Sequence, residues 1–328
     1  MVIVRRGSQP MPLVTTAVCG AGLLFFTTVR PAGAAEAEPP SPPSSEEAAP
    51  PTPPTRAPYT LPFQLRGMIP KPGVRLDSTF APYQLNGTRG FETVVFWSAQ
   101  LPIVDSLSVV GRWGLDDNQS DQPGYNRTGI LNPTLGVLLG LPLRSDFRFA
   151  ASAAAGFPIA TGGGNDPRVA DLTLQREGML ARSAMDNTSF AVNDVGVPAG
   201  VSFAYVGYGM TVQLDTTIIP SFRVKGERAQ ADRTKVNSTY GLFFGYRLVP
   251  ELSVGAELRY QRYLSTPATV AKDPTARDNL TLAGGPRIHV RLTDTAWMRP
   301  GLSYGHGLRG PVERQAFHMV QLDIPFTF

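Results

Sequence analysis

Apolar and polar residues alternate one by one along most of the chain after residue 71. In the stretch 251–263 the apolar and polar positions are Leu252, Val254, Ala256, Leu258 and Tyr260 against Ser253, Gly255, Glu257, Arg259 and Gln261. The stretches 210–224 and 280–292 alternate in the same way. Successive side chains of a strand point to opposite faces, so this period predicts strands with one apolar and one polar face. The low charged fraction, 17%, and the 33 glycines and 31 prolines also argue against a helical bundle.

The connections between these strands alternate in length. Tight turns are expected at 104–106, 144–146, 207–209, 249–251 and 293–295. Longer polar stretches lie between them, at 116–128, 160–193, 225–236 and 266–278, with shorter ones at 85–90 and 309–315. This alternation is typical of an outer-membrane barrel, which has short periplasmic turns and long outer loops.

The turns divide residues 71–328 into about twelve strands, which an antiparallel up-and-down transmembrane β-barrel would arrange in chain order. The expected strands are 73–84, 91–103, 107–116, 129–143, 147–159, 195–206, 210–224, 237–248, 251–265, 279–292, 296–308 and 316–328. Ten or fourteen strands remain possible if 73–84 lies outside the barrel or if 160–193 contains a hairpin. Several prolines, such as Pro220, Pro286 and Pro325, fall within these strands. They count against the prediction because proline cannot donate to a sheet ladder, and bulges are expected near them.

Large charged side chains lie on the polar face in the middle of the strands. Lipid cannot solvate such groups, but a water-filled lumen can, so the pattern favours a membrane barrel over a soluble one. The residues expected to line the lumen are Arg75, Asp77, Glu92, Arg112, Arg148, Asp215, Arg223, Arg247, Glu257, Arg259, Arg287, His289, Arg291, Arg299 and Asp323.

The first 34 residues have the pattern of a secretory signal peptide. Arg5 and Arg6 precede an apolar stretch at 11–29, and small residues at 31–35 provide a cleavage site of the A-x-A kind. An uncleaved anchor helix is the alternative. Three of the 30 Lys and Arg residues lie in this segment, so about 27 remain beside 26 Asp and Glu, and the mature chain has no excess of charge for binding nucleic acid.

Residues 35–70 are expected to form a proline-rich disordered linker in the periplasm. The part 36–58 consists mainly of Pro, Ser, Thr, Ala and Glu, which cannot bury a core. It is either an inert spacer or a segment that reaches a partner.

The last strand ends with apolar residues at alternate positions and a terminal aromatic residue: Val320, Leu322, Ile324, Phe326 and Phe328. This segment resembles the assembly signal of bacterial outer-membrane barrel proteins. The resemblance covers the leader, the terminal strand and the alternation across 71–328, although Pro325 departs from the usual pattern. It implies an outer-membrane location, surrounding lipid, and recognition by periplasmic chaperones and the barrel-assembly machinery. It implies no particular activity, because porins, lipid transporters, adhesins and enzymes share it.

The longest polar stretch, 160–193, contains an expected helix at 167–184. Asp166 and Pro167 suit the start of a helix, and Val169, Leu172, Met179 and Leu180 would form its apolar stripe. Charged residues such as Arg176, Glu177 and Arg182 are expected to face water. This loop either folds into the barrel and narrows it or rests on the outer rim.

The balance of lumen charges suggests a function. Nine of the expected lumen residues are arginines and five are carboxylates, so an open lumen would favour anions, whereas a narrow one would be plugged by ion pairs. The first hypothesis is therefore a passive channel for small polar or anionic solutes. The second is a structural or interaction barrel with an occluded lumen, and a weaker third is a transporter of hydrophobic ligands.

No enzymatic activity, cofactor or metal site is expected. Each of the three histidines lacks the serine two residues away that outer-membrane lipases carry. The only cysteine, Cys19, lies in the predicted signal peptide, which excludes disulfides and cysteine metal sites in the mature chain.

Overall fold

The computed structural model describes residues 59–85, 87–227 and 232–328. The chain divides into two units, Met1–Pro53 and Pro54–Phe328, and all described residues belong to the second unit. The predicted signal peptide, 1–34, and residues 35–58 of the predicted linker lie outside the described residues.

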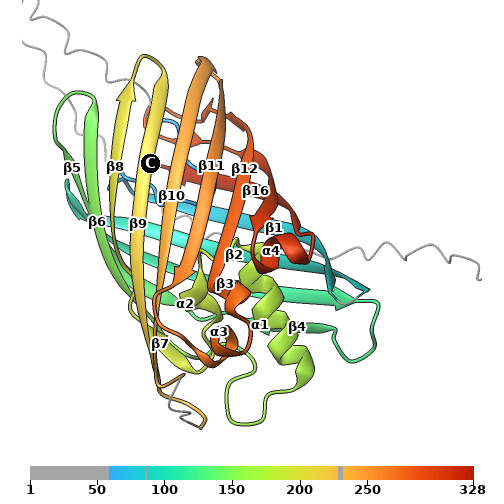
Figure 1. Ribbon diagram of the computed structural model, residues 1–328. Coiled ribbons are helices and arrows are strands. Elements are labelled where there is room, and N and C mark those ends of the chain that lie inside the picture. Colours follow the sequence, from blue (N-terminus) through green and yellow to red (C-terminus); the bar gives the residue numbers. More distant parts are fainter. Residues whose placement is uncertain (1–58, 86, 228–231) are drawn as a thin grey trace, which may run out of the picture. The chain divides into compact units, whose positions relative to one another are not determined.

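Residues from 73 onward form a closed antiparallel barrel in which the wall is crossed twelve times (Figure 1). The order around the wall follows the chain, and β1 pairs with β16 from Gly73↔Thr327 to Phe80↔Val320 to close it. This confirms the predicted fold class and strand count. The strands are β1 (Gly73–Leu85), β2 (Thr88–Val104), β3 (Leu107–Ser120), β4 (Arg127–Ile130), β5 (Thr134–Pro142), β6 (Phe147–Gly156), β7 (Asp194–Gly196), β8 (Ala199–Gly207), β9 (Met210–Arg223), β10 (Thr234–Val249), β11 (Leu252–Tyr263), β12 (Asp278–Ile288), β13 (Val290–Arg291), β14 (Trp297–Met298), β15 (Gly301–Arg309) and β16 (His318–Thr327).

Four crossings of the wall are split into two shorter strands. Pro133 lies between β4 and β5, Pro198 between β7 and β8, and Pro300 between β14 and β15. Proline has no backbone N–H, so the ladder is interrupted there. The fourth interruption, between β12 and β13, is at His289, whose N–H bonds the carbonyl of Glu251 across the adjacent turn.

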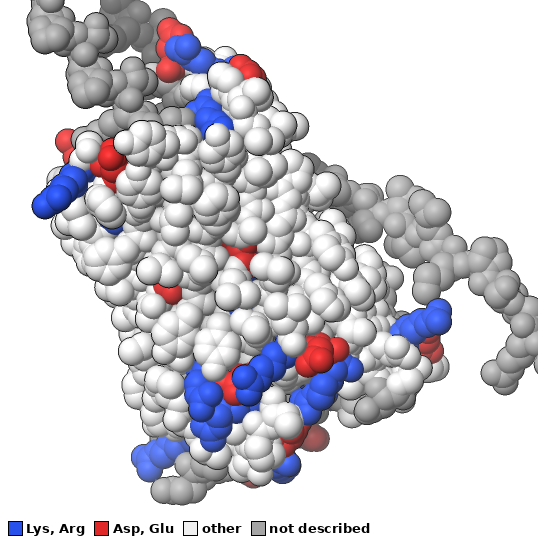
Figure 2. Space-filling model, turned by 45° about the horizontal axis from the view of Figure 1, so that its top comes forward, with Lys and Arg blue, Asp and Glu red and all other residues white. Residues whose placement is uncertain are grey.

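The two faces of the wall differ as the alternation predicts. In β10 the side chains of Tyr240, Leu242, Phe244 and Tyr246 are exposed on the outside, and the residues between them are buried inside. Figure 2 shows a broad band with few charged side chains, while Lys, Arg, Asp and Glu gather toward the ends. An apolar exterior around a polar interior is the arrangement of a transmembrane barrel, because lipid surrounds the outside and polar groups must pair within.

The two ends of the barrel differ. Tight turns join the strands at one end, here called the short-turn rim, and the longer connections and the helices gather at the other end, the loop rim (Figure 1). The helices are α1 (Val169–Ala181), α2 (Asn187–Phe190), α3 (Ala268–Lys272) and α4 (Pro311–Arg314), with a 3-10 turn at Pro274–Arg277. None of the helices in the described residues is both long and apolar enough to cross a membrane.

Two segments that are not part of the wall fill the interior. The lumen segment, residues 59–70, precedes β1 at the short-turn rim, and the inner loop, residues 157–193, connects β6 and β7 at the loop rim. Each packs on its own apolar cluster. Tyr59 and Met68 of the lumen segment pack with Leu138, Ala150, Ala204 and Val206 of the wall. Leu180, Ala181 and Phe190 of the inner loop pack with residues of β1, β2 and β16 and with Val312 and Phe317.

Glycines on the inner face of the wall make room for the lumen segment. A Cβ atom on Gly241 would lie 2.4 Å from Leu65 Cδ2, and one on Gly245 would lie 2.8 Å from Thr60 Cβ. The backbone of β10 can therefore approach the inserted chain more closely than any other residue would permit.

Candidate functional site

The lumen segment is held by polar groups of the surrounding wall. The carboxylate of Glu257 in β11 accepts hydrogen bonds from the backbone N–H groups of Phe63 and Gln64. Arg287 donates to the carbonyls of Leu61 and Pro62, each at 3.1 Å. Neutral side chains also take part, since Gln213 donates to the carbonyl of Arg66 and Gln100 to that of Ile69. Side chains of the wall thus satisfy the segment's backbone where no ladder is available.

The same charged residues also pair with one another. Asp323 of β16 receives Arg75 Nε at 2.6 Å and Arg287 Nη2 at 2.5 Å. Glu257 receives Arg259 Nε at 2.7 Å. Since Glu257 and Asp323 are fully buried, each carboxylate is compensated by arginine rather than by bulk water.

The residues 59–70 differ from the predicted disordered linker. Phe63, Leu65 and Met68 are buried, at 1%, 3% and 2% exposure, and the segment is ordered against the wall. The disordered composition ends at residue 58. From there Leu61, Phe63 and Leu65 repeat at every second position, which is a sequence signal for an extended buried segment.

The inner loop is fixed at the point where β4 gives way to β5. Asn132, which is fully buried there, donates to the carbonyls of Thr188 and Ala191 at 3.1 and 2.9 Å and accepts from Ala160 N–H at 2.8 Å. The loop then turns sharply after α1, where Ser183 and Ala184 adopt φ values of 55° and 53°. Such left-handed conformations are unfavourable for residues other than glycine, and here they bring Arg182 and Asp186 to the same part of the lumen.

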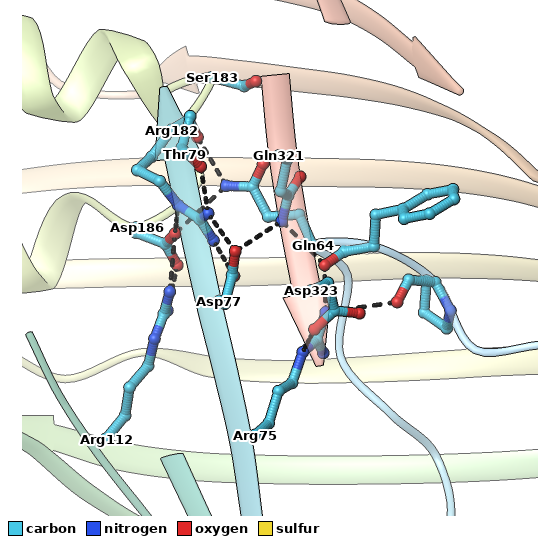
Figure 3. A network of polar contacts seen from close by, with 12 residues as sticks. Gln64, Arg75, Asp77, Thr79, Arg112, Arg182, Ser183, Asp186, Gln321 and Asp323 are labelled. Carbon is cyan, nitrogen blue, oxygen red and sulfur yellow. Dashed lines mark hydrogen bonds and ion pairs between the residues drawn. The ribbon is translucent and has the colours of Figure 1, made fainter. Parts of the chain in front are cut away.

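Arg182 is the centre of the polar network in the lumen (Figure 3). Its guanidinium group binds Asp77 of β1 through two nitrogens, at 2.9 and 2.6 Å, and donates to Thr79 Oγ1 at 2.7 Å. Its Nε donates to Asp186 at 2.9 Å. Arg182 is 1% exposed, so these contacts replace its hydration almost completely.

Asp186 connects Arg182 to Arg112 on the wall. Arg112 of β3 binds both carboxylate oxygens of Asp186, one of them at 3.1 Å. Burial alone would raise the pKa of Asp186, but the guanidinium groups of Arg112 and Arg182 hold it below its usual value. Asp186 is therefore ionised at physiological pH, and the inner loop is tied to β1 and β3 by charge-assisted hydrogen bonds.

The two inserts meet at the side chain of Gln64. Its amide nitrogen donates to the carbonyl of Arg182 at 2.7 Å and to Asp186 at 3.2 Å. Gln321 of β16 extends the connection, because it donates to the Phe63 carbonyl and to Asp77, each at 2.9 Å. The lumen is thus filled from both rims, and the fillings touch in the middle.

A second cluster of buried polar residues, under the inner loop, consists of acids. Glu92 of β2, Asp116 of β3 and Glu177 of α1 are buried, at 0%, 1% and 0% exposure. Neither Glu92 nor Asp116 makes a hydrogen bond through its carboxylate oxygens within the described residues, and Arg176 lies 3.5 Å from Glu177. This acid cluster, defined as these three residues, therefore lacks the arginines that compensate the carboxylates around Arg182.

A cavity of about 340 Å3 remains beside the inserts. It extends from the strand ends at the short-turn rim, with Lys71 and Thr327 in its lining, to Met185, Asp186 and Ser189 of the inner loop. The charged side chains that line it are five cations and three carboxylates: Arg66, Lys71, Arg75, Arg112, Arg299, Asp77, Asp186 and Asp215. Arg66 Nη1 is buried and makes no hydrogen bond in the part of the chain that is described.

The structure brings most of the predicted lumen residues to the interior. Arg75, Asp77, Arg112, Glu257, Arg259, Arg287 and Asp323 belong to the network around the inserts. Asp215 accepts from Ser202 at 2.5 Å, Arg148 lies 6.0 Å from the ring of Tyr59, Arg299 lines the cavity, and Glu92 lies in the acid cluster.

Three predicted lumen residues lie instead at the rims. Arg223 donates to the carbonyl of Lys225, Arg247 to those of Val249 and Pro250, and Arg291 to Thr293 and Asp294. The period-two pattern gives the face of a strand but not the depth of a residue along it. A long arginine at a strand end can therefore reach a turn carbonyl and remain in water.

His289 makes a buried hydrogen bond to Ser253, with 2.8 Å between Nε2 and Oγ. Ser253 is 1% exposed, and within the described residues no carboxylate is hydrogen-bonded to the His289 ring. The pair therefore lacks both the access and the orienting acid of a nucleophilic serine. The absence of enzymatic activity stays a prediction.

Sequence reasoning did not identify Gln64, Arg182, Asp186, Asp116 or Glu177 as site residues. The expected apolar stripe of α1 is also wrong in part, since Val169 and Leu172 are 57% and 50% exposed whereas Glu177 is buried. The helix turns an acidic and small-residue face inward because Gly178 lies directly against Asp116, where a Cβ atom would be 2.1 Å from Asp116 Oδ2.

The terminal strand has the predicted alternation. Val320, Leu322 and Phe328 are 39%, 36% and 53% exposed on the outer face, and Ile324 and Phe326 share that face. Pro325 faces inward, and its carbonyl accepts from Arg299 N–H at 2.9 Å, so it does not interrupt the closure with β1. Recognition of this strand by the assembly machinery stays a prediction.

No family model matches the chain, and no curated protein matches its sequence. Among solved structures, the NanC porin aligns with 78% of this chain and 98% of its own, with a TM-score of 0.45 and 8% identity. The KdgM porin aligns with 77% of this chain and 99% of its own, with a TM-score of 0.42 and 8% identity. The β domain of the Bordetella autotransporter BrkA aligns with 79% of this chain and 100% of its own, with a TM-score of 0.45 and 13% identity. At these values the structures share only general barrel architecture with the chain, so the functional argument rests on the residues of the lumen.

Proposed function

We propose that this protein is an outer-membrane channel for small polar or anionic solutes, and that the inner loop closes its bore. The observation that carries the proposal is the charged cavity, which runs from the short-turn rim past the lumen segment and ends against the inner loop. Movement of the inner loop would connect this cavity to the loop rim and leave the wall intact.

The inner loop is suited to such movement because it is not part of the wall. It lies between β6 and β7, whose ladders with their neighbours are formed by other residues. All hydrogen bonds between the two inserts in the described part of the chain come from the single amide of Gln64. Undocking therefore breaks side-chain contacts and a few backbone hydrogen bonds, such as that from Asn132 N–H to the Ser189 carbonyl, and leaves the sheet closed.

The lining of the cavity supports a preference for anions. Its cations exceed its carboxylates by two, and both Asp77 and Asp186 are already bound by Arg182. Arg66 and Arg299 are in no ion pair within the described residues. A low-dielectric wall around unpaired cations attracts small anions and disfavours cations.

Planar-bilayer recording of the purified protein tests this proposal. We expect the Arg182→Ala variant to conduct far more than the wild type, with a reversal potential in a salt gradient that shows anion preference. In that background Arg299→Ala should weaken the preference, whereas the matched control Arg291→Ala, an exposed arginine paired with Asp294 at the short-turn rim, should leave it unchanged. A variant without current at any voltage, or with cation preference, would contradict the proposal.

A structural barrel with a permanently occluded lumen is the second candidate. The continuous network from Asp323 through Glu257 and Asp77 to Asp186 favours it, since satisfied buried networks rigidify an interior. The same recordings separate the two, because a permanent plug predicts no current even without Arg182. The hydrophobic-ligand alternative gains no support, since each crossing of the described wall is paired with neighbours on both sides.

A further inference from the structure

The acid cluster lies between the part of the inner loop that must move and the wall that does not. Glu177 projects from α1, while Glu92 and Asp116 belong to β2 and β3. The surrounding side chains are those of the apolar cluster, including Tyr83, Phe96, Leu180 and Phe190. Docking of α1 therefore removes three carboxyl groups from water together.

The titratable and polar groups facing Glu177 do little to neutralise it. They are Glu92 from β2, Asp116 from β3, Tyr83 from β1, Arg176 from α1, and Gln315, which follows α4. Arg176 is half exposed. With its amide oriented so that nitrogen faces the carboxylate, Gln315 donates to Glu177 at 2.6 Å and its oxygen accepts from Arg176 at 2.6 Å. One screened cation thus stands against several acids.

The neutral forms of these groups fit the site better. Protonated carboxyl groups can donate to one another, which would satisfy the carboxylate oxygens of Glu92 and Asp116 that otherwise have no partner. Ionised groups would repel one another in a region of low dielectric.

We propose that the acid cluster is a pH switch that keeps the inner loop docked when protonated and releases α1 as the carboxyl groups ionise. Only the inner loop is released. The lumen segment stays in place, since it is held by the ion-paired Glu257 and by Arg287. The switch rests on the proposed function for its effect on current, because release of α1 would open the cavity toward the loop rim.

The sign of the pH dependence follows from Glu177. Burial raises the pKa of Glu177 from 4.5 to about 7, and Arg176 offsets this only in part. An acid that is easier to protonate in the docked state favours docking at low pH and opposes it as the pH rises from about 4.5 to 7. Between these values one such group weakens docking by up to about tenfold per pH unit, or roughly 50- to 100-fold from pH 5 to pH 8.

Hydrogen exchange of the whole protein in nanodiscs, with protection factors corrected for intrinsic exchange, tests the switch without relying on current. The α1 amides of the wild type should lose roughly 50- to 100-fold of their protection between pH 5 and pH 8. Glu177→Gln should stay protected across this range, and Asp116→Asn should reduce the loss. The control Asp166→Asn, an exposed acid in the same loop, should behave as the wild type.

Two outcomes overturn the switch: wild-type protection that does not change with pH, or the same pH dependence in Glu177→Gln and Asp166→Asn. Parallel bilayer recordings keep the two proposals apart. If the protection of α1 depends on pH but no current flows at any pH, the channel is contradicted and the switch stands. If current flows but does not change from pH 5 to pH 8, the switch is contradicted.

Discussion

The lumen segment and the inner loop fill the same barrel from opposite rims, but they are held in different ways. The lumen segment has its backbone bound by Glu257 and by arginines that are themselves paired with carboxylates. The inner loop is bound on one side by Arg182 and on the other rests on the acid cluster, whose one arginine, Arg176, is half exposed. The buried carboxylates that hold the lumen segment are therefore compensated by arginines, whereas the inner loop is compensated in this way on one side only.

This difference predicts that the lumen segment stays in the barrel while the inner loop can move. Removing the lumen segment would leave Glu257 and Arg287 without several of their partners, which is costly at any pH. Removing the inner loop would break the contacts of Arg182 but would return the acid cluster to water. The inner loop is thus the insert whose position ordinary changes of condition can alter.

The largest effect is expected for Arg182→Ala, which acts on the inner loop alone. The variant leaves Asp77 buried without its main partner and Asp186 with Arg112 alone, at a cost of about 3–5 kcal/mol. Protection of the α1 amides against hydrogen exchange should fall accordingly, and that of residues 61–66 should change little. The exposed Arg168→Ala is the control, expected to cost about 0–1 kcal/mol. Equal losses in both inserts would remove the distinction between them.

A smaller effect, confined to the lumen segment, is expected for Glu257→Gln. The substitution weakens charge-assisted hydrogen bonds to Phe63 and Gln64, at a cost of about 1.5–3 kcal/mol. Exchange of residues 61–66 should accelerate while α1 stays protected. The exposed Glu251→Gln, at the adjacent turn, should have no effect. Loss of protection in α1 of the same size would show that the two inserts unfold as one.

The smallest effect is expected for Gln64→Ala, which removes the hydrogen bonds between the inserts. A cost of about 1 kcal/mol is expected, shared by the lumen segment and the inner loop. Exchange of both should rise by a few fold, and Gln122→Ala, exposed at the loop rim, serves as the control. An effect well above that of Glu257→Gln would mean that this contact and not the wall holds the lumen segment.

The wall was predictable from the sequence because its information is local. Alternation in stretches such as 251–263 sets the faces, and the tight turns set the strand order, so twelve crossings follow without knowledge of distant contacts. Pro133, Pro198 and Pro300 interrupt strands but not the barrel, because the other residues of each crossing keep the ladder.

The contents of the lumen were not predictable to the same degree. Arg182 and Asp77 are 105 positions apart, and no sequence pattern indicates which of many arginines will meet which aspartate. Glu177 was expected to face water because charged residues usually do, and only the glycine beside it and the closeness of Asp116 explain its burial. The loop 160–193 was known to be long enough to enter the barrel, but its depth depends on Asn132 and on two residues with positive φ.

The most direct test of the account is a reversible lock on the inner loop. A Cβ atom on Gly156 would lie 3.6 Å from Thr188 Cβ, within the usual range of about 3.5–4.5 Å for a disulfide, so Gly156→Cys with Thr188→Cys should link β6 to α2. Single-channel current of this pair in the Arg182→Ala background should be absent under oxidising conditions and appear on reduction. Equal current in both states, or none in either, would contradict the claim that the inner loop closes the bore.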